Sequence, residues 1–433
     1  MLLAQKLLKN CYVKKSGGVD NRSGDEFIFN PVETASTSNV NLRMIPYVFS
    51  TTRTYNLVFG HLVMYVIKDG AVVFNSTKTV SISAGGGGVT VSYSGTDDYA
   101  AGDIVYVETT DQVGYPNSKN YHRRYFLVSS VNTGANTFVF TYLNGQAVIG
   151  LGSVGAITLK RVYKVTTPYV ASDLASLKYA QSKGTLTLTH PTYAERELTT
   201  TADDAWSLST ISKVPTQVAP TSGAAAQQGV TGAAVYNYKL AAINDNTKEE
   251  SLPTAAFGVT NGNATLDTTN YISITCTAAS GATEYGVYKE LNQSGTYGFI
   301  GFLTSGSAFR DIGYTPDTTD RPIDSRDPFG STNNYPSCVA YYQQRRGFAN
   351  TNNDTEIVEF SRTAFPNNFT VSKPSQDNDA VSFTASGARA NPVRHMVDLG
   401  NLVLFTDSGE KIVQGDGAGV LKPTSINLKT VFL

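Results

Sequence analysis

Short runs of alternating apolar and polar residues, separated by glycine, asparagine, aspartate or proline, constrain this chain more than any other feature. Examples between residues 335 and 417 are Glu356-Ile-Val-Glu-Phe-Ser, Ala380-Val-Ser-Phe-Thr and Asn401-Leu-Val-Leu-Phe-Thr. Because side chains alternate between the faces of a strand, this period of two predicts half-buried antiparallel strands. Several such strands with little helix between them predict an all-β, multi-domain protein that contains propeller blades or sandwiches.

The spacing of these runs predicts three parts. A propeller-like core is discontinuous and takes residues 1–75, 166–212 and 329–433. Residues 76–165 form a small β-barrel inserted into this core, because Thr166-Thr-Pro-Tyr-Val resumes the pattern that precedes it. In the first part, Asp69-Gly70 lies between two apolar runs and predicts a tight hairpin. Between Ser172 and Leu177, a capping serine and two leucines on one face predict a short helix.

Residues 213–328 have a different composition. They open with a stretch rich in proline, alanine and glycine, Lys213 to Gly232, which is interpreted as a linker. The alternating strands that follow, such as Tyr236-Asn-Tyr-Lys-Leu, resemble a fibronectin type III β-sandwich. That family usually has tryptophan where this chain has Cys276.

Charged residues in the last hundred residues form candidate ion pairs. Gln343-Gln344-Arg345-Arg346-Gly347 is interpreted as a charged turn that closes the aromatic run before it. We expect Arg345, Arg346 and Arg362 to pin neighbouring strands by pairing with Asp377, Asp379 or Glu359. Asp377 and Asp379 lie two positions apart, so they can share a face and hold a metal cation, although acidic turns more often cap strands.

Composition argues against several classes of function. The charged fraction is 16% and the formal net charge is −1, so bulk charge does not favour general nucleic-acid binding. The three cysteines are far apart, as expected for a protein made in a reducing cytoplasm, and no apolar run is long enough to insert into a membrane. The glycine spacing at Gly150, Gly152 and Gly155 precedes a β-branched run instead of the helix that a dinucleotide site needs. We therefore expect no cofactor and no enzymatic activity.

The last hundred residues resemble the tail nozzle proteins of short-tailed bacteriophages, the tail tubular protein B family. The resemblance rests on an ordered pattern, given by Tyr335, Arg345, Arg346, Ser361, Arg362, Asp377 and Asp379. An apolar-Ile-Pro-aromatic strand near Ile45 and the run Leu186-Thr-Leu-Thr-His-Pro extend it to the other parts of the core. The family continues beyond this length, so the resemblance implies a core that is incomplete at its C-terminus.

The resemblance implies a structural protein of the virion tail that is assembled in the cytoplasm of a bacterial host. It implies a homo-hexameric ring that docks a head-to-tail adaptor and tail fibres or spikes, and through which double-stranded DNA passes during ejection. Two other functions stay open. The fibronectin-like part and the many tyrosines allow a receptor-binding fibre or adhesin, and a tail-associated glycan hydrolase would require two converging carboxylates.

Overall fold

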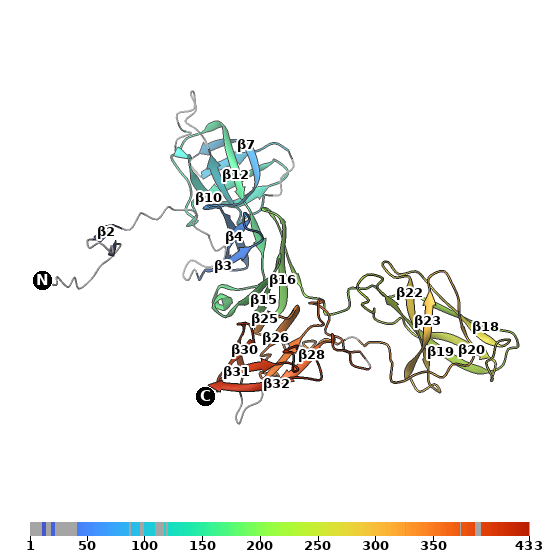
Figure 1. The fold of residues 1–433 in the computed structure, drawn as a ribbon. Helices are drawn as coiled ribbons and strands as arrows, with labels where there is room; N and C mark the ends of the chain where they lie inside the picture. Colours follow the sequence, from blue (N-terminus) through green and yellow to red (C-terminus); the bar gives the residue numbers. More distant parts are fainter. Residues whose placement is uncertain are drawn as a thin grey trace. The chain divides into compact units, whose positions relative to one another are not determined.

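The computed structural model describes residues 11–13, 19–21, 41–85, 88–95, 99–108, 117, 120–324, 326–331, 333–372, 374–385 and 391–432. Strands hold 52% of the residues and helix 2%, which confirms the all-β class (Figure 1). No helix among these residues is long and apolar enough to span a membrane. The chain divides into two compact units, Met1–Ala171 and Ser172–Leu433, and each is described by itself.

The first unit contains an antiparallel sheet with strand order β13-β5-β4-β3, to which β6 adds by pairing with β5. Its strands are β3 (Arg43–Val48), β4 (Thr54–Gly60), β5 (Val63–Lys68), β6 (Ala71–Val72) and β13 (Lys164–Thr166). Asp69 and Gly70 have φ of 51° and 75°, the positive values that a tight hairpin turn requires, so the predicted hairpin is confirmed. A separate pair of strands is β1 (Cys11–Val13) and β2 (Val19–Asn21).

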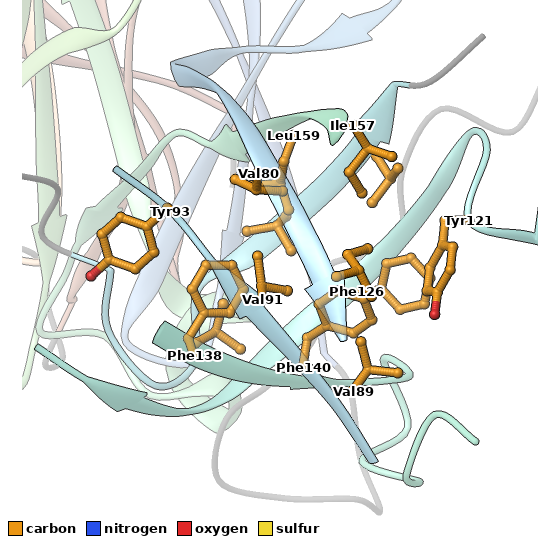
Figure 2. Packing of buried hydrophobic residues seen from close by; sticks show 14 of the residues in the cluster. Val80, Val89, Val91, Tyr93, Tyr121, Phe126, Phe138, Phe140, Ile157 and Leu159 are labelled. Carbon is orange, nitrogen blue, oxygen red and sulfur yellow. The ribbon is translucent and has the colours of Figure 1, made fainter. Parts of the chain in front are cut away.

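The sequence between β6 and β13 forms a closed six-stranded barrel with order β10-β11-β8-β7-β12-β9. Its strands are β7 (Phe74–Gly85), β8 (Gly88–Ser92), β9 (Ile104–Glu108), β10 (Arg124–Asn132), β11 (Thr137–Thr141) and β12 (Val154–Val162). Figure 2 shows side chains from several strands filling its interior, with the rings of Phe126 and Phe140 stacked at 4.3 Å. The predicted barrel is therefore confirmed, and β13 returns from it to pair with β5.

The glycine pattern at Gly150, Gly152 and Gly155 leads directly into β12. A dinucleotide site needs a helix N-terminus at this point, because its free N–H groups bind the pyrophosphate. A strand offers no such cluster of N–H groups.

The described part of the second unit has three sheets of four antiparallel strands in simple chain order. The first holds β14 (Lys178–Ser182), β15 (Thr185–His190), β16 (Tyr193–Ala202) and β17 (Ala205–Thr210). The second holds β25 (Cys338–Tyr342), β26 (Arg345–Ala349), β27 (Ile357–Phe360) and β28 (Val381–Thr384). The third holds β29 (Val393–Asp398), β30 (Leu402–Thr406), β31 (Gly409–Gln414) and β32 (Asn427–Phe432).

These three sheets are neighbours. Strand β25 contacts β14, β15 and β29, and the three sheets lie together in Figure 1. The second and third sheets share an apolar core that includes Val358, Phe360, Leu402 and Leu404. The predicted short helix before β14 is a 3-10 helix, η2 (Ala171–Ser176), in which Leu174 is buried.

Residues 223–311 form two sheets that pack on one core. One sheet has the order β18-β21-β24 and the other the order β20-β19-β22-β23. Their strands are β18 (Gly223–Gln228), β19 (Ala234–Ile243), β20 (Phe257–Gly262), β21 (Tyr271–Cys276), β22 (Glu284–Glu290), β23 (Tyr297–Thr304) and β24 (Phe309–Asp311). Leu240 and Val287 from one sheet and Ile272 and Ile274 from the other meet in this core.

The interpretation of Lys213 to Gly232 as a linker is wrong, because this stretch contains β18. Alanine and glycine have low strand propensity, so the stretch carries no strand signal of its own. The small residues are needed for packing, since a Cβ at Gly223 would lie 2.2 Å from the ring of Phe257. Antiparallel pairing with β21 supplies the strand's hydrogen bonds.

Candidate functional site

Most of the motif residues that carry the family resemblance in the last hundred residues cluster around β26. The sequence interpretation of Gln343 to Gly347 as one turn is wrong, because the turn is only Gln343-Gln344 and Arg345–Ala349 is a strand with all five residues buried. Two adjacent arginines inside a sheet are unexpected, since a buried charge is costly unless it is paired or hydrogen-bonded. Both arginines meet this requirement with acceptors from distant parts of the unit.

Arg345 is 2% exposed and binds main-chain carbonyl groups. Its Nη1 donates to the oxygen of Ser361 at 2.8 Å and also to that of Asp379, and its Nη2 donates to the oxygen of Asp377 at 3.0 Å. Burial lowers the pKa of Arg345 to about 10, against the attraction of Asp379, so the guanidinium stays charged at neutral pH. Arg345 thus connects the end of β27 to the turn before β28.

Arg346 is 1% exposed and connects two sheets. Its Nη2 pairs with the Glu197 carboxylate of β16 at 2.6 Å, and its Nε donates to the Tyr341 hydroxyl at 3.0 Å. Its Nη1 donates to the Asn367 side-chain oxygen at 2.5 Å. Sequence reasoning did not identify Glu197 as a partner, because no local pattern connects residues 149 positions apart.

The two aspartates of the motif have different surroundings. Asp379 is buried, pairs with Arg362 at 3.0 Å, and accepts hydrogen bonds from the amide nitrogens of Ser372 and Gln376. This is one of the ion pairs expected from the sequence. The Asp377 side chain is 73% exposed and pairs with Lys422 at 2.8 Å. No cluster of three or more histidine, cysteine, aspartate or glutamate side chains suited to a metal occurs among the described residues.

The remaining members of the pattern differ in their contacts. Ser361 is buried, and its hydroxyl accepts a hydrogen bond from the Arg346 amide at 3.0 Å. Glu359 forms an ion pair with Arg326 at 2.6 Å instead of with one of the three motif arginines, and burial raises the pKa of its carboxyl group. Tyr335 is half-buried and makes none of these contacts. We call Arg345, Arg346, Ser361, Arg362 and Asp379 the arginine network.

A hollow of about 690 Å³ lies beside this network, and sequence reasoning missed it. It is lined by residues of the β14–β15 turn, the β25–β26 turn and the end of β29, together with the loop after β27. The lining includes Ser182, Lys183, Gln343, Gln344, Ala364 and Asp398. The first hairpin of each of the three four-stranded sheets therefore contributes to one concave surface.

The backbone around the hollow is unusual. Thirteen non-glycine residues of the described chain have positive φ, and four of them line this hollow: Lys183, Gln343, Gln344 and Ala364. Two-residue hairpin turns of this type normally use asparagine and glycine, because other residues are strained there. The Gln343 side chain helps to hold the turn, since its amide accepts from the Leu421 nitrogen and donates to the Gly419 oxygen, both at 2.8 Å. A glutamine pair in a turn is the one sequence signal that could have pointed to the hollow, and sequence reasoning did not use it.

The arginine network and the hollow offer different chemistry. The charges of the network are paired with carboxylates or bonded to main-chain oxygens of the same chain, so its residues hold loops and sheets in place. The hollow instead presents side chains that are open to solvent, with Lys183, Gln344 and Asp398 all exposed. No protein-family model matches this chain, and no curated protein matches it in sequence.

Proposed function

We propose that this chain is a structural protein of a phage virion, the tail nozzle of a short-tailed bacteriophage. It assembles as a homo-hexameric ring, docks the head-to-tail adaptor and the tail fibres or spikes, and conducts double-stranded DNA during ejection. The observation that carries the proposal is the arginine network. Five of the seven motif residues that give the resemblance in the last hundred residues gather into one buried network, whose bonds tie strands of the same chain together, as a framework motif should.

The order of the sheets supports a propeller-like core. Propeller blades are four-stranded antiparallel sheets arranged around a central channel. The sheets β14–β17, β25–β28 and β29–β32 have this strand order, and their first hairpins meet at the hollow. We interpret them as three successive blades, and the two-sheet domain of residues 223–311 as a fibronectin type III-like accessory domain between the first and second blades.

Charge is consistent with a DNA channel. Protein cations that contact phosphates release counterions, so many such contacts would hold DNA tightly and slow its passage. The formal net charge of this chain is −1. Arg345 and Arg362 are buried and bonded within the chain, and Glu197 compensates the charge of Arg346, so the three do not form a cationic surface for phosphates.

Negative-stain imaging of the purified chain, alone and mixed with its adaptor, tests the proposal. We expect six-fold rings whose central hole is wide enough for duplex DNA. Rings that form only with the adaptor would mean that the adaptor templates assembly. Monomers in both samples, or three-fold rods, would refute the nozzle function.

The hollow favours one alternative, a receptor-binding protein or adhesin. Ligand sites in proteins are concave and combine apolar walls with a few placed polar groups, and the hollow has this character. It does not favour a glycan hydrolase, because hydrolysis uses two carboxyl groups and Asp398 is the one carboxyl group among its described lining residues. A three-fold rod in the imaging experiment would support the adhesin.

A further inference from the structure

One residue that lines the hollow has hydrogen-bond donors that the chain itself does not use. An arginine side chain has five N–H groups. Arg346, which lines the hollow, uses three of them on Glu197, Tyr341 and Asn367, which leaves two without an acceptor among the described residues. A buried donor without an acceptor is costly, so a ligand oxygen that fills this position gains affinity.

The rest of the lining is polar but nearly balanced in charge. The Arg346 charge is compensated by Glu197 at 2.6 Å, and Lys183 and Asp398 carry opposite charges. The side-chain amide of Gln344 is exposed and has no partner among the described residues. Tyr341 and Pro366 are also among the lining residues.

This combination selects a class of ligand. A strongly anionic ligand such as a polyphosphate would need several uncompensated cations, and the hollow has only Lys183 among its described lining residues. A purely apolar ligand would leave the amide and guanidinium donors unsatisfied. A sugar ring matches the lining, because it has a hydroxyl-rich edge for the donors and an apolar face for carbon atoms of lining residues such as Tyr341 and Pro366. Small-ligand sites usually have volumes of several hundred cubic ångströms, and the hollow falls in this class.

The backbone supports a binding role. Left-handed conformations at non-glycine residues cost free energy, and they are kept where the surrounding structure serves a purpose. Lys183 and Gln344 have φ of 52° and 60°, where glycine would be less strained. Each of these positions therefore carries a long polar side chain where glycine would be less strained.

We propose that this hollow is a binding site for an oligosaccharide, held by Gln344, Lys183 and the two spare N–H groups of Arg346. The site lies within a single chain, so binding does not depend on ring formation, and it can be tested whether or not the nozzle proposal holds.

The test is titration calorimetry of the full chain with a neutral trisaccharide, maltotriose, and an acidic one, sialyllactose. The variants are Gln344→Gly and Lys183→Gly. Both substitutions place glycine at a positive φ, so they remove the side chain without straining the backbone, and the unfolding midpoint should not fall. Losing one or two hydrogen bonds should weaken binding about 3- to 10-fold.

The chain provides matched controls. Gln293 and Lys248 have φ of 55° and 58°, and neither lines the hollow. Gln293→Gly and Lys248→Gly therefore repeat the chemical and backbone change elsewhere, and they should leave binding unchanged. A loss confined to sialyllactose in Lys183→Gly would show that Lys183 binds the acidic group, and an equal loss for both sugars in Gln344→Gly would show that Gln344 binds hydroxyl groups that both kinds of sugar have. Failure of the wild-type chain to bind either sugar at millimolar concentration, or equal losses in the control variants, would overturn the proposal.

Discussion

Replacing Arg345 with methionine should destabilise the second unit strongly. The substitution removes the guanidinium that donates to the main-chain oxygens of Ser361, Asp377 and Asp379. Each buried acceptor that loses its partner costs about 1–3 kcal/mol, and methionine recovers part of this by filling the same space with apolar atoms. We expect a net loss of about 3–5 kcal/mol, which is also the usual cost of breaking a buried charged contact.

Urea unfolding followed by tryptophan fluorescence measures this loss. The sequence contains one tryptophan, Trp206 in β17, so the signal reports the first four-stranded sheet, which Arg346 and Glu197 join to the second. The matched control is Arg394→Met. The Arg394 side chain is 54% exposed and pairs with Asp407 at 2.6 Å. Exposed pairs of this kind contribute only about 0–1 kcal/mol.

The loss in free energy of unfolding for Arg345→Lys should lie between those of Arg345→Met and Arg394→Met. One ammonium group keeps the charge but cannot bind three carbonyl groups at once as the guanidinium does. If Arg345→Met and Arg394→Met lower the free energy of unfolding by the same amount, the buried network contributes no more than a surface ion pair, and the reasoning is wrong.

Two further predictions concern packing and pH. In Gly347→Ala the new Cβ would lie 2.3 Å from the Phe360 ring. Such overpacking should destabilise the second sheet by about 1–3 kcal/mol. In Gly417→Ala no atom lies within 4 Å of the new Cβ, so the urea midpoint should change little. Burial raises the pKa of Glu250 from 4.5 to about 7, against the hydrogen bond from Tyr288. Between pH 4.5 and about 7 the folded state then binds more protons than the unfolded state. The free energy of unfolding should therefore fall as the pH rises through this range. Glu250→Gln should flatten that dependence, and an unchanged pH profile would contradict the assignment.

The fold class could be predicted from the sequence because its signals are local. Alternation and the Asp69-Gly70 turn predicted strands, a barrel and a hairpin that the structure confirms. Strand β18 was missed because its small residues carry no strand preference, and its place depends on Phe257. Strand β26 was missed because two arginines are typical of solvent-exposed turns.

The candidate site was harder to predict because it depends on contacts between distant segments. The partner of Arg346 lies in another sheet, and the hollow forms only where three hairpins meet. The sequence could show that Arg345, Arg346, Arg362 and Asp379 form a charged group. It could not show that Arg345 binds main-chain oxygens instead of carboxylates, or that Arg346 pairs with Glu197.

The return of β13 to β5 has a consequence for how this chain can change over evolution. The barrel leaves the sheet at Phe74 and comes back at Val162, and these two residues are register partners on neighbouring strands. The Tyr163 nitrogen also donates to the Val73 oxygen at 2.8 Å. The two points where the chain enters and leaves the barrel are therefore hydrogen-bonded neighbours. A two-residue turn spans such a gap between antiparallel strands. Loss or exchange of the whole barrel in one genetic event would therefore leave the pairing of β13 with β5 intact. The barrel can thus be replaced as a unit.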